Sequence, residues 1–338
     1  MSKKVPSNNS LRAALIALTV GFVGCANQAA STSFTQTSSN NENLPRVVAT
    51  TSILCDLTKQ VAGNTINLTC LISPSKNPHV YQPKPEDRKA IEQANLILYS
   101  GYNFEPKLIK LIKATKNSAS KIAVSQVAVP KQIKFREGGK IISDPHIWHN
   151  TKNAIKMVEI INRNLVKLEP NNAEIYSSNT KNITNELSQL DGWIKSTIAT
   201  IPANQRKLVT THNGLSYYAK AYNIPLVGAL EGLSAEEKPT ATRVKNLFTS
   251  IKRAKVSTIF AETTIKPNLI ESVARDANVK VSERELYVDG LGEPGSEGDT
   301  YQKMIVANTR TIVEGLGGTY LMFQARASQY NLKSTTGG

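Results

Sequence analysis

The sequence predicts an α/β protein of two similar lobes, each a parallel sheet covered by helices, with one long rigid helix joining the lobes. Two observations carry this prediction. Short apolar runs alternate with helical patterns in both halves of the chain, as expected for parallel strands connected by helices. Between the halves, residues 171–200 hold no Pro and only one Gly, and their apolar residues recur at helical spacing.

The first half alternates strand-like and helical patterns from its beginning. A strand is expected at 46–51, and the helical pattern after it runs to Ala62. Another helix is expected to begin near Thr151. The remaining elements of this half are expected as strands at 65–72, 95–100 and 121–125, and as helices near 84–94 and 104–116.

The second half repeats this order. Its strand-like runs lie at 207–211, 225–229, 256–261 and 279–282, and its helical patterns at 214–223, 239–254, 266–277 and 300–316. The helix between the halves, with about 28 residues, would be roughly 42 Å long. Because a single helix resists bending, we expect the lobes to tilt slightly rather than to swing widely apart.

The amino terminus has the pattern of an export signal. A basic start precedes an apolar stretch over 13–22, which is shorter than the roughly 18–20 residues of a membrane span. The exit, Phe22-Val23-Gly24-Cys25-Ala26, resembles a bacterial lipobox, although Phe22 stands where Leu is usual. It predicts cleavage before Cys25 and lipidation of the Cys25 thiol. The alternative is ordinary secretion with an incidental cysteine.

The residues after Cys25 are mostly Ser, Thr, Asn and Gln, which cannot bury enough apolar surface to order themselves. They predict a flexible tether. The expected organisation is a signal peptide at 1–24, the tether at 25–44, an N-terminal lobe at 45–168, a connecting helix at 169–202 and a C-terminal lobe at 203–330.

The chain is basic, with 41 Lys and Arg against 26 Asp and Glu. The sequence shows neither a dense basic block nor interleaved aromatic residues that would stack on bases, so no nucleic-acid partner is expected. An exported protein can form disulfides, and Cys55 and Cys70 are 15 residues apart. A bridge between them would stabilise the fold by roughly 3 kcal/mol. The alternative is a buried free thiol at Cys70.

Three of the four histidines fall where strands or helices end or begin. His79 follows the second strand, His146 precedes the helix near Thr151, and His212 directly follows a strand of the second half. Because ligands of α/β sheets bind beyond the carboxyl ends of the strands, these imidazoles can converge between the lobes. Asp289 is the best candidate for a carboxylate partner, and a simple Asp-Gly turn is the alternative for it.

These segments resemble the metal-binding solute receptors of bacterial ABC importers for zinc, manganese and iron, the ZnuA-like family also called cluster A-I. The resemblance covers nearly the whole mature chain, and several motifs match in order. They are Asn77-Pro78-His79-Val80-Tyr81-Gln82-Pro83, Asp144-Pro145-His146-Ile147-Trp148, the run from His212 to Tyr222, Phe260-Ala261-Glu262, Leu286-Tyr287-Val288-Asp289-Gly290-Leu291-Gly292, and the closing stretch from Tyr301 to Leu316.

The resemblance places the four metal ligands of the family on His79, His146, His212 and Asp289. The third position is typically Glu in manganese and iron receptors and His in most zinc receptors, and here it is His212. Asp144 and Glu262 are the candidates for orienting the imidazoles, with a helix cap or a surface carboxylate as the alternative for each. His149 matches no family ligand and is expected near the site or in solvent.

Three imidazoles and one carboxylate suit a divalent cation such as Zn²⁺, which the Irving–Williams order places above Mn²⁺ in affinity. Dedicated zinc receptors of the family often carry a loop rich in His and Asp between the first two ligands, whereas residues 130–143 contain no His. One ion of Mn²⁺ or Zn²⁺ is therefore expected as cargo, and the choice between them stays open.

The resemblance implies capture of this ion outside the cytoplasm, in the periplasm, and its delivery to the permease and ATPase subunits of an ABC importer. A membrane anchor through Cys25, a monomeric state and no enzymatic activity are expected with it. The first alternative is a zinc-dependent hydrolase, disfavoured because four ligands leave no open position and HExxH is absent. The second is a metal-binding surface adhesin. A literal GxGxxG at 290–295 is interrupted by Glu293 and Pro294, which argues against phosphate binding.

Overall fold

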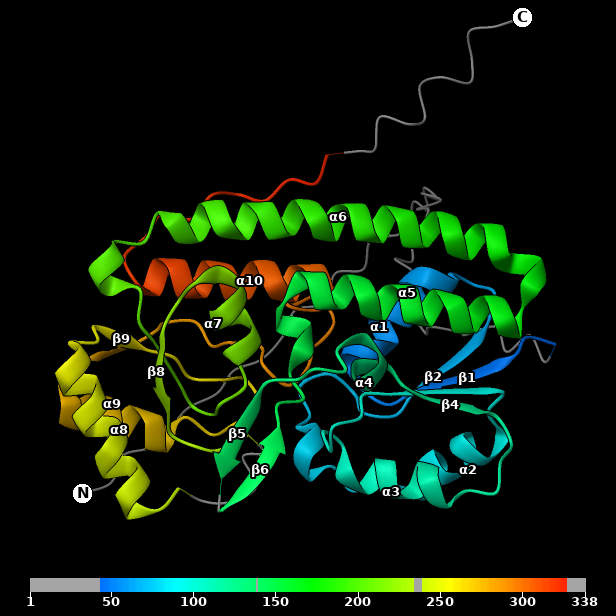
Figure 1. Cartoon of the computed structure of the whole chain (residues 1–338), viewed down its shortest axis with the longest axis horizontal. Helices are drawn as coiled ribbons and strands as arrows, with labels where there is room; N and C mark the ends of the chain where they lie inside the picture. The colour runs from blue at the N-terminus through cyan, green and yellow to red at the C-terminus, as the bar shows by residue number, and fades with distance from the viewer. Residues whose placement is uncertain (1–42, 138, 234–238, 327–338) are drawn as a thin grey trace, which may run out of the picture. The chain divides into compact units, whose positions relative to one another are not determined.

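The computed structural model describes residues 43–137, 139–233 and 239–326, all within one compact unit. Cys25, the signal peptide and nearly all of the expected tether lie outside the described residues. Among the residues that are described, no helix has both the length and the apolar character to cross a membrane. The predicted class, an α/β fold of two lobes joined by one long helix, is confirmed (Figure 1).

The N-terminal lobe is built on a four-stranded parallel sheet with the strand order β2-β1-β3-β4. Its strands are β1 (Arg46–Ala49), β2 (Asn67–Cys70), β3 (Leu96–Tyr99) and β4 (Ser120–Ala123). Its helices are α1 (Ser52–Ala62), α2 (Pro85–Gln93), α3 (Pro106–Ala114), α4 (Val124–Ala128) and α5 (Thr151–Leu168), with short 3₁₀ helices η1 (Pro78–Val80) and η2 (Ile147–His149). The strand prediction for 121–125 is wrong at its end, because Val129 N donates to Ser125 O and closes a helical turn there.

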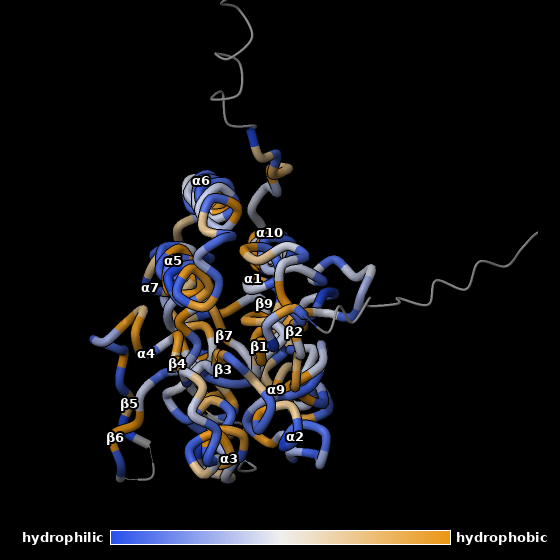
Figure 2. The backbone as a smooth tube through the Cα atoms, turned by 90° about the vertical axis from the view of Figure 1, so that its right-hand side faces the viewer, coloured by the Kyte–Doolittle hydropathy of each residue, from blue (hydrophilic) through white to orange (hydrophobic). Residues whose placement is uncertain are grey.

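Helices cover both faces of this sheet (Figures 1 and 2). Side chains of a strand alternate between its two faces, so neighbouring residues of β1 enter different cores. Val48 packs with Leu108 and Ile112 of α3, whereas Val47 packs with Leu54 and Leu57 of α1. The sheet is thus buried from both sides, as its apolar strands predict.

A hairpin that the sequence analysis did not predict precedes the second histidine motif. It consists of antiparallel strands β5 (Lys134–Glu137) and β6 (Lys140–Ser143). At its base, the backbone N–H of Ile133 donates to the hydroxyl of Tyr217 in the C-terminal lobe, at 3.0 Å. The hairpin therefore contacts both lobes.

The connecting helix α6 (Ala173–Ala199) has 27 residues, within the predicted range. It lies between the short 3₁₀ helices η3 (Pro170–Asn172) and η4 (Ala203–Gln205). The C-terminal lobe contains strands β7 (Leu208–Thr210), β8 (Leu226–Ala229), β9 (Thr258–Ile259) and β10 (Lys280–Val281), and helices α7 (Ser216–Tyr222), α8 (Ala241–Ala254), α9 (Asn268–Ala277) and α10 (Tyr301–Gly315). Its parallel pairs β7–β8 and β9–β10 are shorter than expected and are joined by a bridge between Thr210 and Phe260.

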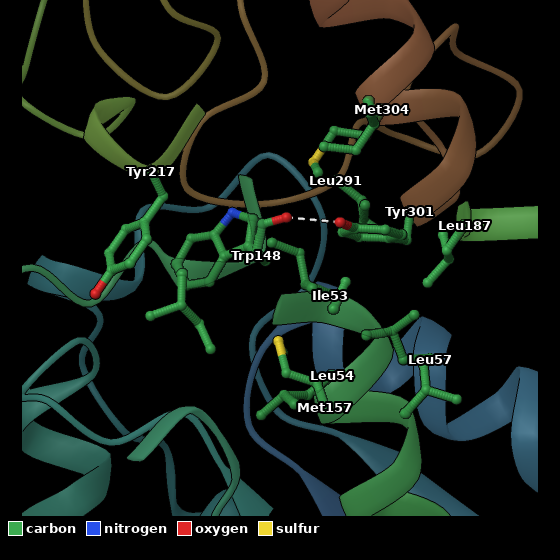
Figure 3. Packing of buried hydrophobic residues seen from close by; sticks show 14 of the residues in the cluster. Ile53, Leu54, Leu57, Trp148, Met157, Leu187, Tyr217, Leu291, Tyr301 and Met304 are labelled. Atoms are coloured by element: carbon green, nitrogen blue, oxygen red, sulfur yellow. Dashed lines mark hydrogen bonds between the residues drawn. The ribbon is translucent and has the colours of Figure 1, made fainter. Parts of the chain in front are cut away.

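One apolar core runs through both lobes (Figure 3). Ile53 of α1 and Trp148 belong to the N-terminal lobe, and Tyr301 and Met304 of α10 belong to the C-terminal lobe, yet all four lie in the same buried cluster. The Tyr301 hydroxyl donates a hydrogen bond of 2.6 Å to the backbone carbonyl of Trp148. The lobes are thus held together by packing as well as by the connecting helix.

Two further features tie distant segments together. Cys55 of α1 and Cys70 of β2 form a disulfide with a Cα–Cα distance of 5.7 Å, which confirms the predicted bridge. After α10 the chain runs back along α6, where Trp193 Nε1 donates to Leu321 O at 2.7 Å and Gln189 exchanges hydrogen bonds with the backbone of Arg326.

Candidate metal centre

The structure brings His79, His146, His212 and Asp289 together, and one donor atom from each lies within 4.8 Å of the others. Oδ1 of Asp289 is 3.2 Å from Nε2 of both His146 and His212, and 3.6 Å from Nε2 of His79. His79 is 3% exposed and the other three residues are fully buried. Two of these side chains thus come from each lobe and point toward one small volume.

Local structure fixes the two histidines of the N-terminal lobe. The side chain of Asn77 accepts a hydrogen bond from His79 N at 2.9 Å and so begins the 3₁₀ helix η1. Oδ1 of Asp144 accepts from both the backbone N and the ring Nδ1 of His146, at 2.9 and 2.8 Å. Because Nδ1 carries the proton that it donates to Asp144, the lone pair of Nε2 faces the centre.

The same arrangement recurs at His212 in the C-terminal lobe. Glu262 accepts from the backbone N of His212 at 2.9 Å through Oε1, and from its ring Nδ1 through Oε2. Gly214 leaves room for this ring, because a Cβ there would lie 2.7 Å from Nε2 of His212. Asp144 and Glu262 thus hold equivalent positions behind two of the imidazoles.

The buried charges of the centre shift its pKa values strongly. Burial disfavours charge on His212, but Glu262 and Asp289 outweigh it and raise the pKa of His212 well above its usual value. Burial would raise the pKa of Asp289, but the charge on His212 and hydrogen bonds from the histidines hold it well below its usual range. Burial lowers the pKa of His79, whereas hydrogen bonds with Asp144 and Asp289 overcome burial and raise the pKa of His146.

A contact between the lobes that the sequence analysis missed lies beside these four residues. His149 Nε2 and Trp148 Nε1 both donate to the backbone carbonyl of Val288, at 2.9 and 3.2 Å. His149 is buried, not in solvent, and burial lowers its pKa to about 3, so the ring stays neutral. The loop that follows His146 is thereby attached to the residue that precedes Asp289. The only signal in the sequence is that both donors directly follow the His146 motif.

An aromatic wall, also missed, closes the centre on the side of the N-terminal lobe. The Phe104 ring lies 4.8 Å from the His79 ring and 5.5 Å from the His146 ring, measured between centroids. Next to it, burial raises the pKa of Glu105 to about 7. Apolar rings around these side chains exclude water and strengthen the electrostatic interactions inside.

A family model described as the zinc-uptake complex component A, periplasmic, matches residues 47–315, which include all four residues of the centre. The chain belongs to the ZnuA family. The match runs from β1 to the last residue of α10, so both lobes and the connecting helix are family features.

Two bacterial lipoproteins are similar to this chain over most of their length. The metal ABC transporter substrate-binding lipoprotein ScbA of Streptococcus cristatus is 35% identical over 309 residues, covering 89% of this chain and 97% of the relative. The manganese ABC transporter substrate-binding lipoprotein PsaA of Streptococcus mitis is 35% identical over 279 residues, covering 80% and 89%.

Solved structures of similar proteins support the same fold. The periplasmic zinc-binding protein TroA from Treponema pallidum has a TM-score of 0.76 and 28% identity, and the match covers 81% of this chain and 99% of TroA. A manganese-bound periplasmic metal-binding protein from Candidatus Liberibacter asiaticus, the S38A mutant, has a TM-score of 0.72 and 25% identity, covering 80% and 99%.

Replacing Glu262 with Gln is expected to weaken metal binding by this ZnuA-family chain about 10- to 100-fold, the usual effect of losing a partner behind a metal-bound imidazole. The amide has only one oxygen to accept from the two nitrogens of His212, so the ring loses its fixed orientation and its basicity. Titration with Mn²⁺ and with Zn²⁺ measures the effect. Glu271→Gln, in the helix α9, is the control, and equal affinities of the two variants would contradict the prediction.

Replacing His149 with Leu is expected to weaken metal binding about tenfold, because Val288 O loses one of its two donors and Asp289 becomes less well positioned. His149→Gln places an amide N–H near the position of Nε2 and is expected to restore most of the affinity. If Gln and Leu weaken binding equally, the hydrogen bond is not what positions Asp289. Calorimetric titration of both variants decides this.

Proposed function

We propose that this chain is the extracytoplasmic substrate-binding protein of an ABC importer, and that it captures one Mn²⁺ or Zn²⁺ ion for delivery to a membrane permease driven by an ATPase. His79, His146, His212 and Asp289 are the proposed ligands. The observation that carries the proposal is the convergence of these four buried side chains, two from each lobe, on one volume. Membership of the ZnuA family and the named metals of the relatives support it.

The chemistry of the donor set agrees with this cargo. Three imidazole nitrogens and one carboxylate oxygen satisfy tetrahedral Zn²⁺ at about 2.0–2.2 Å. Mn²⁺ prefers more oxygen donors, and the second oxygen of Asp289 is available for a bidentate contact beside its 3.3 Å hydrogen bond from Thr264. Either ion would also relieve the repulsion among the three inward-facing imidazoles.

The arrangement suits transport rather than catalysis. Catalytic zinc sites usually have three protein ligands and keep a fourth position for water or substrate, whereas this centre offers four side chains. We therefore propose that the chain has no enzymatic activity and works as a monomer, anchored to the periplasmic side of the membrane by a lipid on Cys25. The relatives named as lipoproteins support the anchor.

Parallel titrations of the metal-free protein with Zn²⁺ and with Mn²⁺ test the proposal. One ion per chain is expected, with Zn²⁺ bound more tightly than Mn²⁺. His212→Glu replaces an imidazole with a carboxylate, and its preference is expected to shift toward Mn²⁺. Lys152→Glu adds a carboxylate at an exposed position of α5 and serves as the control. A structure of the metal-bound protein with the ion away from these four side chains would refute the proposal.

A further inference from the structure

The positive charge of the folded chain is concentrated in one lobe. Residues 45–168 hold 19 Lys and Arg and 8 Asp and Glu, whereas residues 169–330 hold 18 and 17. The N-terminal lobe therefore carries nearly all of the excess, and the connecting helix with the C-terminal lobe is close to neutral. If the excess of Lys and Arg served only to keep the protein soluble, it would not need to be confined to one lobe.

Within the N-terminal lobe, the excess is strongest around α3. Residues 106–136 contain eight Lys and Arg and no Asp or Glu. On α3, Leu108, Ile109 and Ile112 are buried, and the exposed side carries Lys107, Lys110 and Lys113. The helix thus buries its apolar side in the lobe and presents a row of lysines to the outside.

The hairpin continues this basic surface. In two perpendicular views, α2, α3 and the β5–β6 hairpin lie on the side of the folded part away from α6 (Figures 1 and 2). Exposed Lys134, Arg136 and Lys140 belong to the hairpin, and next to them Ile141 is 65% exposed. We define the basic face as the exposed Lys and Arg of α3 and this hairpin. The helix α2 is not part of it, because Glu86, Asp87 and Glu92 outnumber its two basic residues, Arg88 and Lys89.

The chain enters the fold beside α2, a helix on the same side of the folded part as α3. Arg46, at the start of β1, lines a surface hollow together with Glu86, Lys89 and Gln93 of α2. Nineteen residues lie between Cys25 and Pro45. An anchor at Cys25 would keep the folded part within reach of the membrane, whichever side it turns toward the surface.

We propose that the basic face binds the anionic headgroups of phospholipids, so that the N-terminal lobe rests on the membrane surface. Lysines and arginines close to an anionic membrane are attracted to it, and the attraction is lost beyond about one Debye length, roughly 10 Å at 0.1 M salt. Exposed Ile141 adds an apolar side chain at the headgroup level. The proposal is independent of the metal site, and only the position of the anchor rests on the proposed function.

Sedimentation with vesicles tests the proposal on the chain from Ala26 onward, which carries the whole tether and no lipid. Binding is expected to phosphatidylcholine vesicles that contain phosphatidylglycerol, to fall steeply as salt is raised, and to be absent with phosphatidylcholine alone. The triple variant Lys107→Gln, Lys110→Gln, Lys113→Gln is expected to bind about 100-fold more weakly, at roughly fivefold per lysine.

The matched control neutralises three exposed basic residues of the C-terminal lobe, Lys220→Gln, Lys245→Gln and Arg253→Gln, and is expected to bind vesicles like the wild type. Circular dichroism and metal titration check that both variants remain folded. Equal vesicle binding by the two triple variants, or none by the wild type, would overturn the proposal. If vesicles do not bind but the α3 variant slows metal uptake in cells, the face contacts an acidic protein surface and the lipid assignment is wrong.

Discussion

The Asp289→Ala protein is expected to bind Mn²⁺ and Zn²⁺ at least on the order of 100-fold more weakly than the wild type. A structural zinc site has a binding free energy of about 10–16 kcal/mol, which is roughly 3 kcal/mol for each of four ligands. Asp289 supplies the only negative charge among the four donors, and its Oδ1 faces all three imidazoles. Without it, a divalent ion would enter a buried site with no anionic ligand. Competition titrations with a chelator of known affinity measure the loss.

Two companion variants separate ligation from folding. Asp289→Asn keeps the shape and the contact with Thr264 but not the charge, and it is expected to lose nearly as much affinity as Asp289→Ala. Glu293→Ala removes an exposed carboxylate four residues farther along the same loop and is expected to bind normally. An Asp289→Ala protein that stays within tenfold of the wild type would show that Asp289 is not a ligand.

Metal affinity is expected to fall on the order of 1000-fold between about pH 8 and pH 5.5. The pKa of His212 is raised well above its usual value and that of His146 is raised too, each through neighbouring carboxylates that outweigh burial. In both rings Nδ1 already holds a proton, so a second proton occupies Nε2, the atom that faces the metal. As pH falls through the raised pKa values, the ion must displace these protons. Each ring then lowers the metal affinity by up to about tenfold for every pH unit.

Proton release during binding gives the direct measurement. Calorimetry near pH 7 in two buffers with different heats of ionisation is expected to show protons leaving the protein as metal binds. Glu262→Gln removes a charge that raises the pKa of His212 and is expected to release fewer protons at the same pH. Constant affinity over this pH range, or no proton release near its middle, would contradict the assignment of the imidazoles as ligands.

The four residues that meet in the centre could be predicted from the sequence because each lies in a short motif at the end of an element. His212 directly follows a strand, and His79 and His146 each lie in a Pro-His motif. Local patterns of this kind can be recognised without knowing any tertiary contact. The matching order of several motifs then selected these four residues, from among the other polar residues, as the proposed ligands.

Features that depend on contacts between distant residues could not be predicted. The expectation for His149 left open a place near the site or in solvent, because its partner, the carbonyl of Val288, is 139 residues away and belongs to the backbone. The β5–β6 hairpin lies in a charged segment with little alternation of apolar residues, so periodicity gave no strand signal there. The short strands β9 and β10 were overestimated because apolar residues beyond them are buried by packing against helices rather than by pairing in a sheet.

The apolar cluster shared by α1, Trp148 and α10 determines whether the two halves of this protein can fold separately or be exchanged with those of a relative. Each half on its own would expose the side chains that the other half now covers, so neither is expected to be an autonomous folding module. We therefore expect a single cooperative transition when the protein is unfolded by heat. A chimaera could join the first half of this chain to the second half of a relative. It would be expected to fold only if all the residues of this shared cluster came from the same parent, and not only those at the point where the two sequences are joined.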